Sequence, residues 1–286
     1  MFDTHCHLNF KAFEGRVEEV VNNAIEAGIS LIVVPGTDRE SSEEAVKIAE
    51  RFSGVYAAVG IHPHHVFQIN QKTENRKNQS SDFSYLLSDL SEIEKLLVNP
   101  KVVAVGEVGV DRHYYSKTKY PNYNVYPEFI EGQKEFLNRQ IDLGLKYNKS
   151  LIFHNREAKK DFLEVVRDKW DEKLAGRAVF HCCEPDSELL NFAKKHKIFI
   201  GIDGDITFRE DKQEFIKTVP LDLLVLETDS PFLLPSQLRV GNKKRPANEP
   251  KNLQLVAVFI AELLRMKTKA LVKITTENSK KLFQIS

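Results

Sequence analysis

The arrangement of eight short apolar runs, separated by longer amphipathic stretches, constrains the fold of this chain most strongly. The runs are rich in Val, Ile and Phe and are bounded by Gly, Pro or polar residues, which is typical of parallel strands buried on both faces. In the stretch 126–147, apolar residues recur on one helical face, and Pro127 stands where a first helical turn tolerates proline. Strands are predicted at about 2–6, 30–35, 55–60, 102–106, 150–153, 178–181, 198–202 and 223–227.

Eight strand–helix units in one chain are explained more economically by a closed barrel than by an open, doubly wound sheet. No dinucleotide-binding fingerprint follows the first strand, which argues against the open sheet and against an organic cofactor of that kind. The 286 residues suit one such barrel, and a hydrophobic fraction of 42% supplies one sizeable core. The sequence therefore predicts a single α/β domain over residues 1–286, folded as a (β/α)8 TIM barrel.

The amino-acid composition limits which partners the protein could bind and in which cellular compartment we expect it. The 41 basic and 41 acidic side chains give a formal net charge of zero, so a nucleic acid would have to be held by a local patch or by metal ions. Three cysteines, two of them adjacent, do not form a disulfide framework and suit a reducing compartment. We see neither the pattern of a signal peptide nor an apolar run near the roughly 18 residues that span a membrane. We expect a cytoplasmic protein without a membrane partner.

Polar residues follow several of the predicted strands at their carboxyl ends, where barrels of this type carry their active sites. In an extended segment, residues two apart point to the same side, so two such histidines can reach one cation. The candidate metal ligands are His5 and His7 after the first strand, Glu107 after the fourth, His154 after the fifth, His181 after the sixth and Asp229 after the eighth.

This mixture of imidazole and carboxylate donors suits Zn²⁺, Mn²⁺ or Mg²⁺. Two such ions about 3.5–4 Å apart can activate water and stabilise both oxygens of a phosphoryl displacement. Each residue alone also has an ordinary interpretation: His154 or His181 as a core histidine, Glu107 as a helix cap, Asp229 as a turn residue. Their coincidence at the ends of five strands favours the metal site.

The order of the motifs resembles the TatD family of metal-dependent deoxyribonucleases, a branch of the amidohydrolase-type barrels. The resemblance covers essentially the whole chain. It rests on DTHCHL at 3–8, GIHPH at 60–64, VGEVGVD at 105–111, HNR at 154–156, HC at 181–182, ETDSPFL at 227–233 and NEP at 248–250.

The resemblance implies two divalent metal ions per chain. His5, His7, Glu107 and Asp229 would hold the first ion, and Glu107 would bridge to a second ion held by His154 and His181. Glu107 and Asp229 would be the catalytic carboxylates, and Asp229 would orient or deprotonate the attacking water.

The resemblance also implies residues that contact the substrate. His62 and His64 would face it, and Arg156 would pair with a phosphate through its planar fork. The basic stretch 239–245 follows the eighth strand, so Lys243, Lys244 and Arg245 are further candidates, although an exposed, solvated loop explains that stretch as well. His65, His113 and His196 are expected on the surface.

Two positions depart from the family pattern. After His181, the family usually carries a Cys-Phe-Ser/Thr-Gly-like turn, whereas this chain has Cys182-Cys183-Glu184-Pro185, which adds an acid beside the site. Asn155 stands where a small hydroxyl residue is usual. We expect structural roles for all three cysteines.

Three functions compete. The first is hydrolysis of DNA phosphodiester bonds with 3′–5′ exonuclease character, RNA being a second nucleic-acid substrate to test. The second is hydrolysis of aminoacyl ester, amide or lactone bonds on the same barrel, for example in a D-aminoacyl-tRNA. Related barrels often bridge their metals with a carboxylated lysine at the fourth strand, and the glutamate found here favours the nuclease. The third is a non-catalytic binding protein, which the complete ligand set and the neutral net charge argue against.

Overall fold

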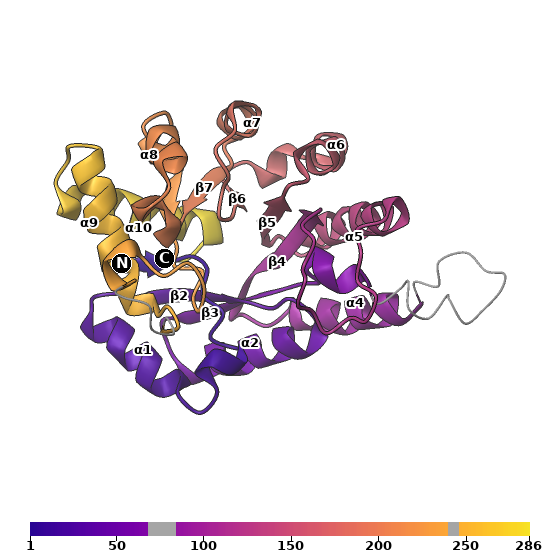
Figure 1. Cartoon of the computed structure of the whole chain (residues 1–286). Coiled ribbons are helices and arrows are strands. Elements are labelled where there is room, and N and C mark those ends of the chain that lie inside the picture. The colour runs from indigo at the N-terminus through magenta and orange to yellow at the C-terminus, as the bar shows by residue number, and fades with distance from the viewer. Residues whose placement is uncertain (68–83, 240–245) are drawn as a thin grey trace.

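The computed structural model describes residues 1–67, 84–239 and 246–286 (Figure 1). Eight parallel strands form one sheet in the order β1 to β8. Between β8 and β1, Cys6 and Ser230 form a parallel bridge, and the Thr4 amide donates to the Leu226 carbonyl at 3.1 Å, so the sheet nearly closes. The strands are β1 (Phe2–Asp3), β2 (Leu31–Pro35), β3 (Val55–Val59), β4 (Val102–Asp111), β5 (Ser150–Arg156), β6 (Ala178–Phe180), β7 (Phe199–Ile202) and β8 (Leu224–Leu226).

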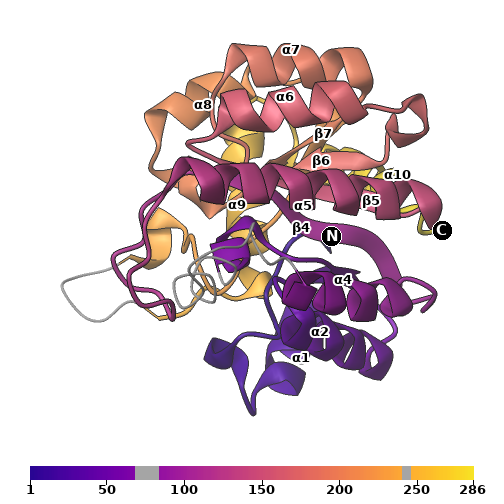
Figure 2. The same ribbon diagram turned by 90° about the vertical axis from the view of Figure 1, so that its right-hand side faces the viewer.

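Helices lie around the outside of this sheet (Figures 1 and 2). The predicted helix at 126–147 is α5, which begins at Pro127 and ends at Lys146. The eight strands and their helical cover confirm the (β/α)8 TIM barrel. The helices are α1 (Val17–Glu26), α2 (Arg39–Arg51), α4 (Ser84–Leu96), α5 (Pro127–Lys146), α6 (Lys159–Lys169), α7 (Ser187–His196), α8 (Glu210–Ile216), α9 (Leu253–Leu263) and α10 (Thr268–Phe283).

Three strand ends differ from the prediction by three residues or more, and one of them is that of β5, which runs on to Arg156 and so includes His154. β1 stops at Asp3, whose carboxylate accepts the amides of His5 and Thr228 at 3.3 and 2.9 Å and so draws the chain out of the ladder. β4 runs on to Asp111, past the glycines that suggested its end. At Gly109 an added Cβ would lie 1.7 Å from the His154 carbonyl oxygen, so this glycine permits close approach of β5 and does not end the strand.

Two hydrophobic clusters surround the strands and leave the carboxyl end of the barrel to polar residues. The larger one lies between the sheet and its helices. The smaller one takes a residue from every strand and includes Phe283 of α10, whose ring packs 5.7 Å from that of Phe2 at the start of β1. Within the described residues, no helix is both long and apolar enough to cross a bilayer.

Candidate metal centre

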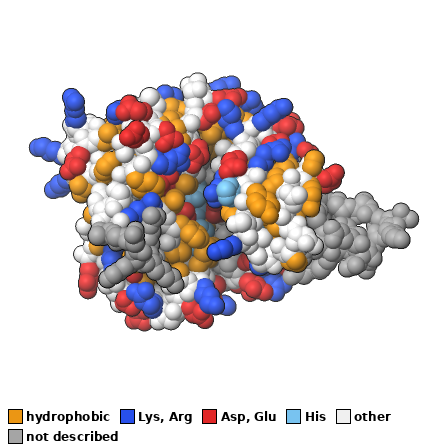
Figure 3. Space-filling model, viewed as in Figure 1, with side chains coloured by type: hydrophobic (Ala, Val, Ile, Leu, Met, Phe, Trp, Pro, Cys, Tyr) orange, Lys and Arg blue, Asp and Glu red, His pale blue; other side chains and the backbone are white. Residues whose placement is uncertain are grey.

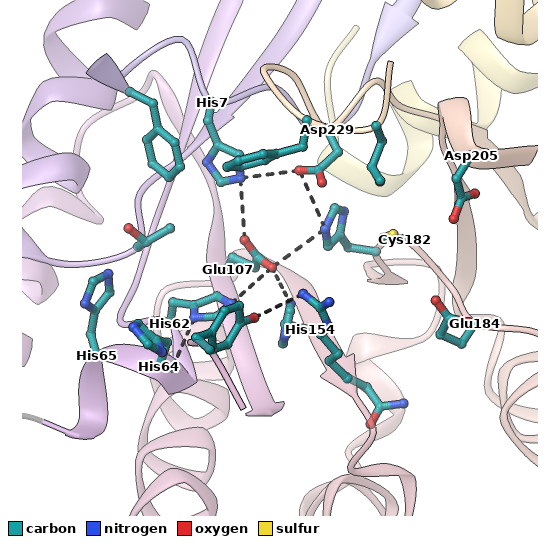
Figure 4. A pocket seen from close by; sticks show the side chains of 18 of the residues that line it. His7, His62, His64, His65, Glu107, His154, Cys182, Glu184, Asp205 and Asp229 are labelled. Carbon is teal, nitrogen blue, oxygen red and sulfur yellow. Dashed lines mark hydrogen bonds and ion pairs between the residues drawn. The ribbon is translucent and has the colours of Figure 1, made fainter. Parts of the chain in front are cut away.

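His5 and His7 converge just beyond β1, as the two-residue spacing predicts, although both lie after the strand. Their Nε2 atoms are 3.1 Å apart, and both residues are buried. His5 Nε2 is 3.4 Å from Glu107 Oε2, and His7 Nε2 is 3.5 Å from Asp229 Oδ1. Two imidazoles from the segment after β1, one carboxylate from β4 and one from the segment after β8 therefore face one point. Figure 4 shows three of these side chains, His7, Glu107 and Asp229.

A second group of donors lies on the other side of Glu107. Its Oε1 atom is 2.5 Å from His154 Nδ1 and 3.7 Å from His181 Nε2. The prediction placed Glu107 at the end of the fourth strand, whereas it lies in the middle of β4. Its side chain is 5% exposed, so its two oxygens are fixed toward two different histidine pairs.

The chemistry of these residues fits divalent cations. The donors of His5, His7 and Asp229 lie within 4.8 Å of one another, as do those of Glu107, His154 and His181. Across the part of the chain that the structure describes, the basic side chains within 4.0 Å of the Glu107 and Asp229 carboxylates are all histidines, and neither acid has a Lys or Arg partner. Burying carboxylates without a cation is costly, and a metal ion would remove that cost.

The pKa values of the same groups show how strongly the carboxylates attract positive charge. Burial lowers the pKa of His154, but Glu107 and Asp111 outweigh it and raise that pKa to about 9. Burial likewise opposes the rise of the His181 pKa, which Glu227 and Glu107 bring to about 10. Burial and the neighbouring His181 lower the pKa of His5 to about 4, which leaves that imidazole neutral and able to bind a metal.

Two buried acids, which sequence reasoning left without a role, orient the histidines of the second group. Asp111 Oδ2 lies 3.1 Å from His154 Nε2, and Glu227 Oε1 lies 3.0 Å from His181 Nδ1. Such carboxylate–histidine pairs fix the tautomer and orientation of a metal ligand. Space for Glu227 depends on Gly201, where an added Cβ would lie 2.6 Å from its Oε2 atom. Asp111 and Glu227 belong to the same sequence motifs as Glu107 and Asp229. That position in the sequence was the signal that could have pointed to their role.

The predicted substrate-contacting residues that the structure describes line one pocket with the metal centre, with a volume of about 590 Å³. Figure 3 shows histidine side chains inside a hollow on this face. His62 Nε2 is 3.5 Å from Glu107 Oε1, and His64 Nε2 is 2.8 Å from the Thr118 hydroxyl. Arg156 lies at the rim. Lys243, Lys244 and Arg245 are outside the described residues.

The loop between β4 and α5 contributes side chains that the sequence did not single out. The Tyr115 hydroxyl donates to Asp111 at 2.7 Å and accepts from Arg156 Nη1 at 3.2 Å. The prediction of a surface position for His65 is wrong, since it lines the pocket and its Nδ1 is 2.6 Å from the Tyr120 hydroxyl. Aromatic packing by this loop partly buries His64 and His65.

The unusual turn after β6 places Glu184 in the opposite wall of the pocket. The Arg209 guanidinium binds it bidentately, with Nη1 and Nη2 each donating to one Glu184 oxygen at 2.8 Å. Arg209 Nη1 is also 3.4 Å from Asp205. The added acid is therefore paired, and this wall is polar, with a surplus of carboxylates.

A separate buried cluster lies behind that wall. Lys212 is fully buried, and its Nζ is 3.2 Å from Asp203, 2.8 Å from Asp205 and 3.8 Å from Cys182 Sγ. The two acids and the thiol are close enough together to hold a metal ion, but the Lys212 ammonium already lies within reach of all three. Cys182 thus packs in an ionic cluster, while Cys6 is fully buried; all three cysteines are free.

A (β/α)8 barrel that gathers histidines and carboxylates from five strands at its carboxyl end has the architecture of a metal-dependent hydrolase. Comparison with known proteins agrees. The family described as TatD related DNase matches residues 2–284, and the chain belongs to this family.

Similar proteins span the full length of the chain. An uncharacterized metal-dependent hydrolase of Bacillus subtilis, YabD, is 33% identical over 288 residues, covering 100% of both chains. The 3′-5′ ssDNA/RNA exonuclease TatD of Escherichia coli is 29% identical over 289 residues, again covering 100% of both. The crystal structure of YJJV, an Escherichia coli TatD homologue, superposes with a TM-score of 0.79 at 25% identity and covers 100% of this chain and 98% of that one. The protein is accordingly a metal-dependent hydrolase of the TatD family.

Proposed function

We propose that residues 1–286 act as one domain that hydrolyses DNA phosphodiester bonds with 3′–5′ exonuclease character, using two divalent metal ions. The observation that carries this proposal is the position of Glu107, whose two oxygens face two separate histidine pairs at the floor of the pocket. The exonuclease name of the 29% identical relative from Escherichia coli supports a nucleic-acid substrate attacked from its 3′ end.

Each residue of the site has a role in this proposal. His5, His7 and Asp229 would hold one ion, His154 and His181 the other, and Glu107 both. Such ions, when bound, lower the pKa of water and neutralise charge on the phosphoryl oxygens. Asp229 accepts the proton of the attacking water, because both acids line the pocket but the Asp229 side chain is 14% exposed and that of Glu107 only 5%. His62, His64 and Arg156 hold the phosphate, the last through its fork of donors.

A substrate panel tests the reaction. Purified protein is incubated with end-labelled single-stranded DNA, RNA and aminoacyl-tRNA, each with Mg²⁺, Mn²⁺ or Zn²⁺ and each with a chelator. We expect DNA to shorten from its 3′ end only when metal is present. Release of the amino acid from aminoacyl-tRNA, with DNA left intact, would reject the nuclease in favour of the esterase. Full turnover by protein shown to contain no metal would reject metal dependence.

The number of ions is tested by comparing Glu107→Ala with His154→Ala. A bridging carboxylate contacts both ions and offsets their mutual repulsion, whereas the histidine contacts one. We expect metal titration to give a larger loss of bound metal for Glu107→Ala. Two ions still bound to that variant would exclude bridging and leave the other ligands in place.

The basic stretch 239–245, which follows β8 in the sequence, is proposed to contact the DNA backbone. Replacing Lys243, Lys244 and Arg245 together with alanine should raise KM and leave kcat largely intact, since remote contacts bind ground and transition states alike. Each lost phosphate contact should reduce the log–log slope of binding against salt by about 0.7–0.9. Steady-state kinetics at several salt concentrations measures both. An unchanged KM and slope would show that these three side chains do not contact the substrate.

A further inference from the structure

An aromatic side chain stands exposed at the edge of the candidate metal centre. Phe232 is 51% exposed, and of the large apolar side chains that the described part of the chain exposes, it alone lines the pocket. It lies three residues after Asp229, and its amide donates to the Asp229 carbonyl at 2.8 Å. The backbone that positions a candidate metal ligand therefore also positions this ring.

Phe232 is part of an aromatic wall, which we define as Phe10 and Phe232. The Phe10 ring lies nearly parallel to the His7 ring, with centroids 4.2 Å apart and an interplanar angle of 19°. Phe232 meets Phe10 edge to face at 6.1 Å and 78°, and it meets His7 at 6.2 Å and 72°. Phe10 is half-buried and lines the same pocket. Both rings of the wall therefore contact His7, which belongs with His5 and Asp229 to one group of candidate metal donors.

The rest of the pocket differs from this wall. On the side of β5, Arg156 and Tyr115 offer a guanidinium and a hydroxyl, and on the side of β6 and β7, Glu184 and Arg209 form their ion pair. Of these two sides, the one with Arg156 suits a phosphate, because the Arg209 guanidinium is already paired with Glu184. The aromatic wall offers a flat apolar surface, which the π-face of a nucleobase matches whatever the base. In a nucleotide, only one sugar lies between the base and the phosphate. When the phosphate of a nucleotide lies at the metal centre, its base can therefore reach the aromatic wall beside that centre.

Resting on the function proposed above, we propose that Phe10 and Phe232 form a stacking subsite for the nucleobase of the nucleotide that carries the scissile phosphate. The subsite would take any of the bases and would require that base to be free on one face, as an unpaired or terminal base is. It makes the base a determinant of substrate binding, although the chemistry occurs at phosphorus.

The same wall has a second interpretation, in which the two rings only shield His7 from water. The two roles predict different consequences of removing Phe232. A shield protects the metal centre during every reaction, so its loss would affect all substrates and the bound metal. A stacking surface acts only on substrates that possess a base at that position.

The experiment compares wild type with Phe232→Ala, Phe232→Tyr and a control, Phe208→Ala. Phe208 is a second exposed phenylalanine, 40% exposed, which does not line the pocket. Each protein is given single-stranded oligonucleotides that end in a normal nucleotide or in an abasic nucleotide. Equilibrium binding to an oligonucleotide ending in 2-aminopurine is measured with Ca²⁺ in place of the activating metal. Bound metal is quantified for every variant.

We expect Phe232→Ala to weaken binding of the base-bearing oligonucleotide by about 5- to 150-fold, the range measured for loss of a stacked aromatic. Binding of the abasic oligonucleotide, the amount of bound metal and kcat should change little in Phe232→Ala, and Phe232→Tyr should behave as wild type. The fluorescence of 2-aminopurine should be quenched on binding to the proteins that keep an aromatic ring at position 232, and not on binding to Phe232→Ala. An equal loss on both oligonucleotides, or a loss of bound metal, would overturn the subsite and favour the shield.

The outcomes also separate this proposal from the proposed function. If wild type cleaves DNA while Phe232→Ala affects both oligonucleotides equally, the nuclease stands and the subsite is wrong. If wild type binds the base-bearing oligonucleotide through Phe232 without cleaving it, the subsite stands and the nuclease is wrong. Absence of both binding and cleavage would reject both.

Discussion

The barrel mouth contains two buried clusters of ionisable side chains, and they differ in the source of their positive charge. In one, the Lys212 ammonium lies within 3.2 Å of Asp203 and Asp205, so the chain supplies its own cation. In the other, the basic side chains that face Glu107 and Asp229 among the described residues are all histidines, whose imidazoles, unlike the lysine, can give up a proton and bind a metal ion. Both clusters contain donors close enough together for a metal ion. Their difference teaches that donor spacing alone does not define a metal site, because an internal lysine can take the place of the ion.

The two clusters also differ in what surrounds the acids. Burial raises the pKa of Asp205, and Asp203 beside it adds to the rise, which brings the pKa to about 8. For Glu107, burial is outweighed by His62, His154 and His181, which hold its pKa well below the ordinary value. The Lys212 cluster is therefore suited to structure, and the Glu107 cluster presents an ionised carboxylate for binding a cation.

The largest effect that would sharpen this comparison is expected for Asp229→Asn. An amide cannot take the proton of the attacking water and is a poorer metal ligand. Proton transfer alone is typically worth about 10²–10⁴-fold in rate, so kcat at saturating metal should fall at least that far while the protein stays folded. Asp222→Asn, at an exposed carboxylate shortly before β8, is the matched control and should be neutral. Turnover within a few-fold of wild type would assign the proton transfer to another group.

Lys212→Met should give the next largest effect, on stability. Removing one partner of a buried ion pair leaves an uncompensated charge, which costs about 3–5 kcal/mol. The control is Lys217→Met, since Lys217 forms an exposed ion pair with Glu214 at 2.6 Å, and such pairs contribute about 0–1 kcal/mol. Denaturant unfolding of both variants measures the difference. Equal losses for the two variants would show that the buried ammonium is not the cation that stabilises this cluster.

Asp111→Asn should produce the smallest of the three effects. Asp111 contacts His154 Nε2 and does not take part in either donor group of the proposed metal pair. Loss of such an orienting carboxylate typically weakens metal binding about 10- to 100-fold. Tyr115→Phe removes the hydroxyl that donates to Asp111 Oδ2 while keeping the carboxylate, and it should leave metal affinity near that of wild type. Isothermal titration with metal makes the comparison, and equal affinities in all three proteins would remove Asp111 from the metal centre.

The amino-acid sequence by itself determined the architecture and the six candidate ligands. Strand and helix periodicity are local properties, so all eight strands were predicted, although the ends of β1, β4 and β5 differ from the prediction by three residues or more. The spacing of His5 and His7 is local as well, and the position of each remaining ligand after an apolar run placed it at the carboxyl end of the barrel. These inferences need only the period of a strand and the rule that parallel strands end on the same side.

Only the tertiary structure decided which of these residues contact one another. The two oxygens of Glu107 face different histidine pairs because the barrel brings residues from the ends of β1, β5 and β6 around one side chain of β4. The pairing of Lys212 with Asp203 depends on how α8 packs against the end of β7. The partners in such contacts come from separate elements, and their distances depend on strand register and helix packing. Local sequence patterns do not specify those distances, and so the distinction between a metal centre and a lysine-filled cluster appeared only in the fold.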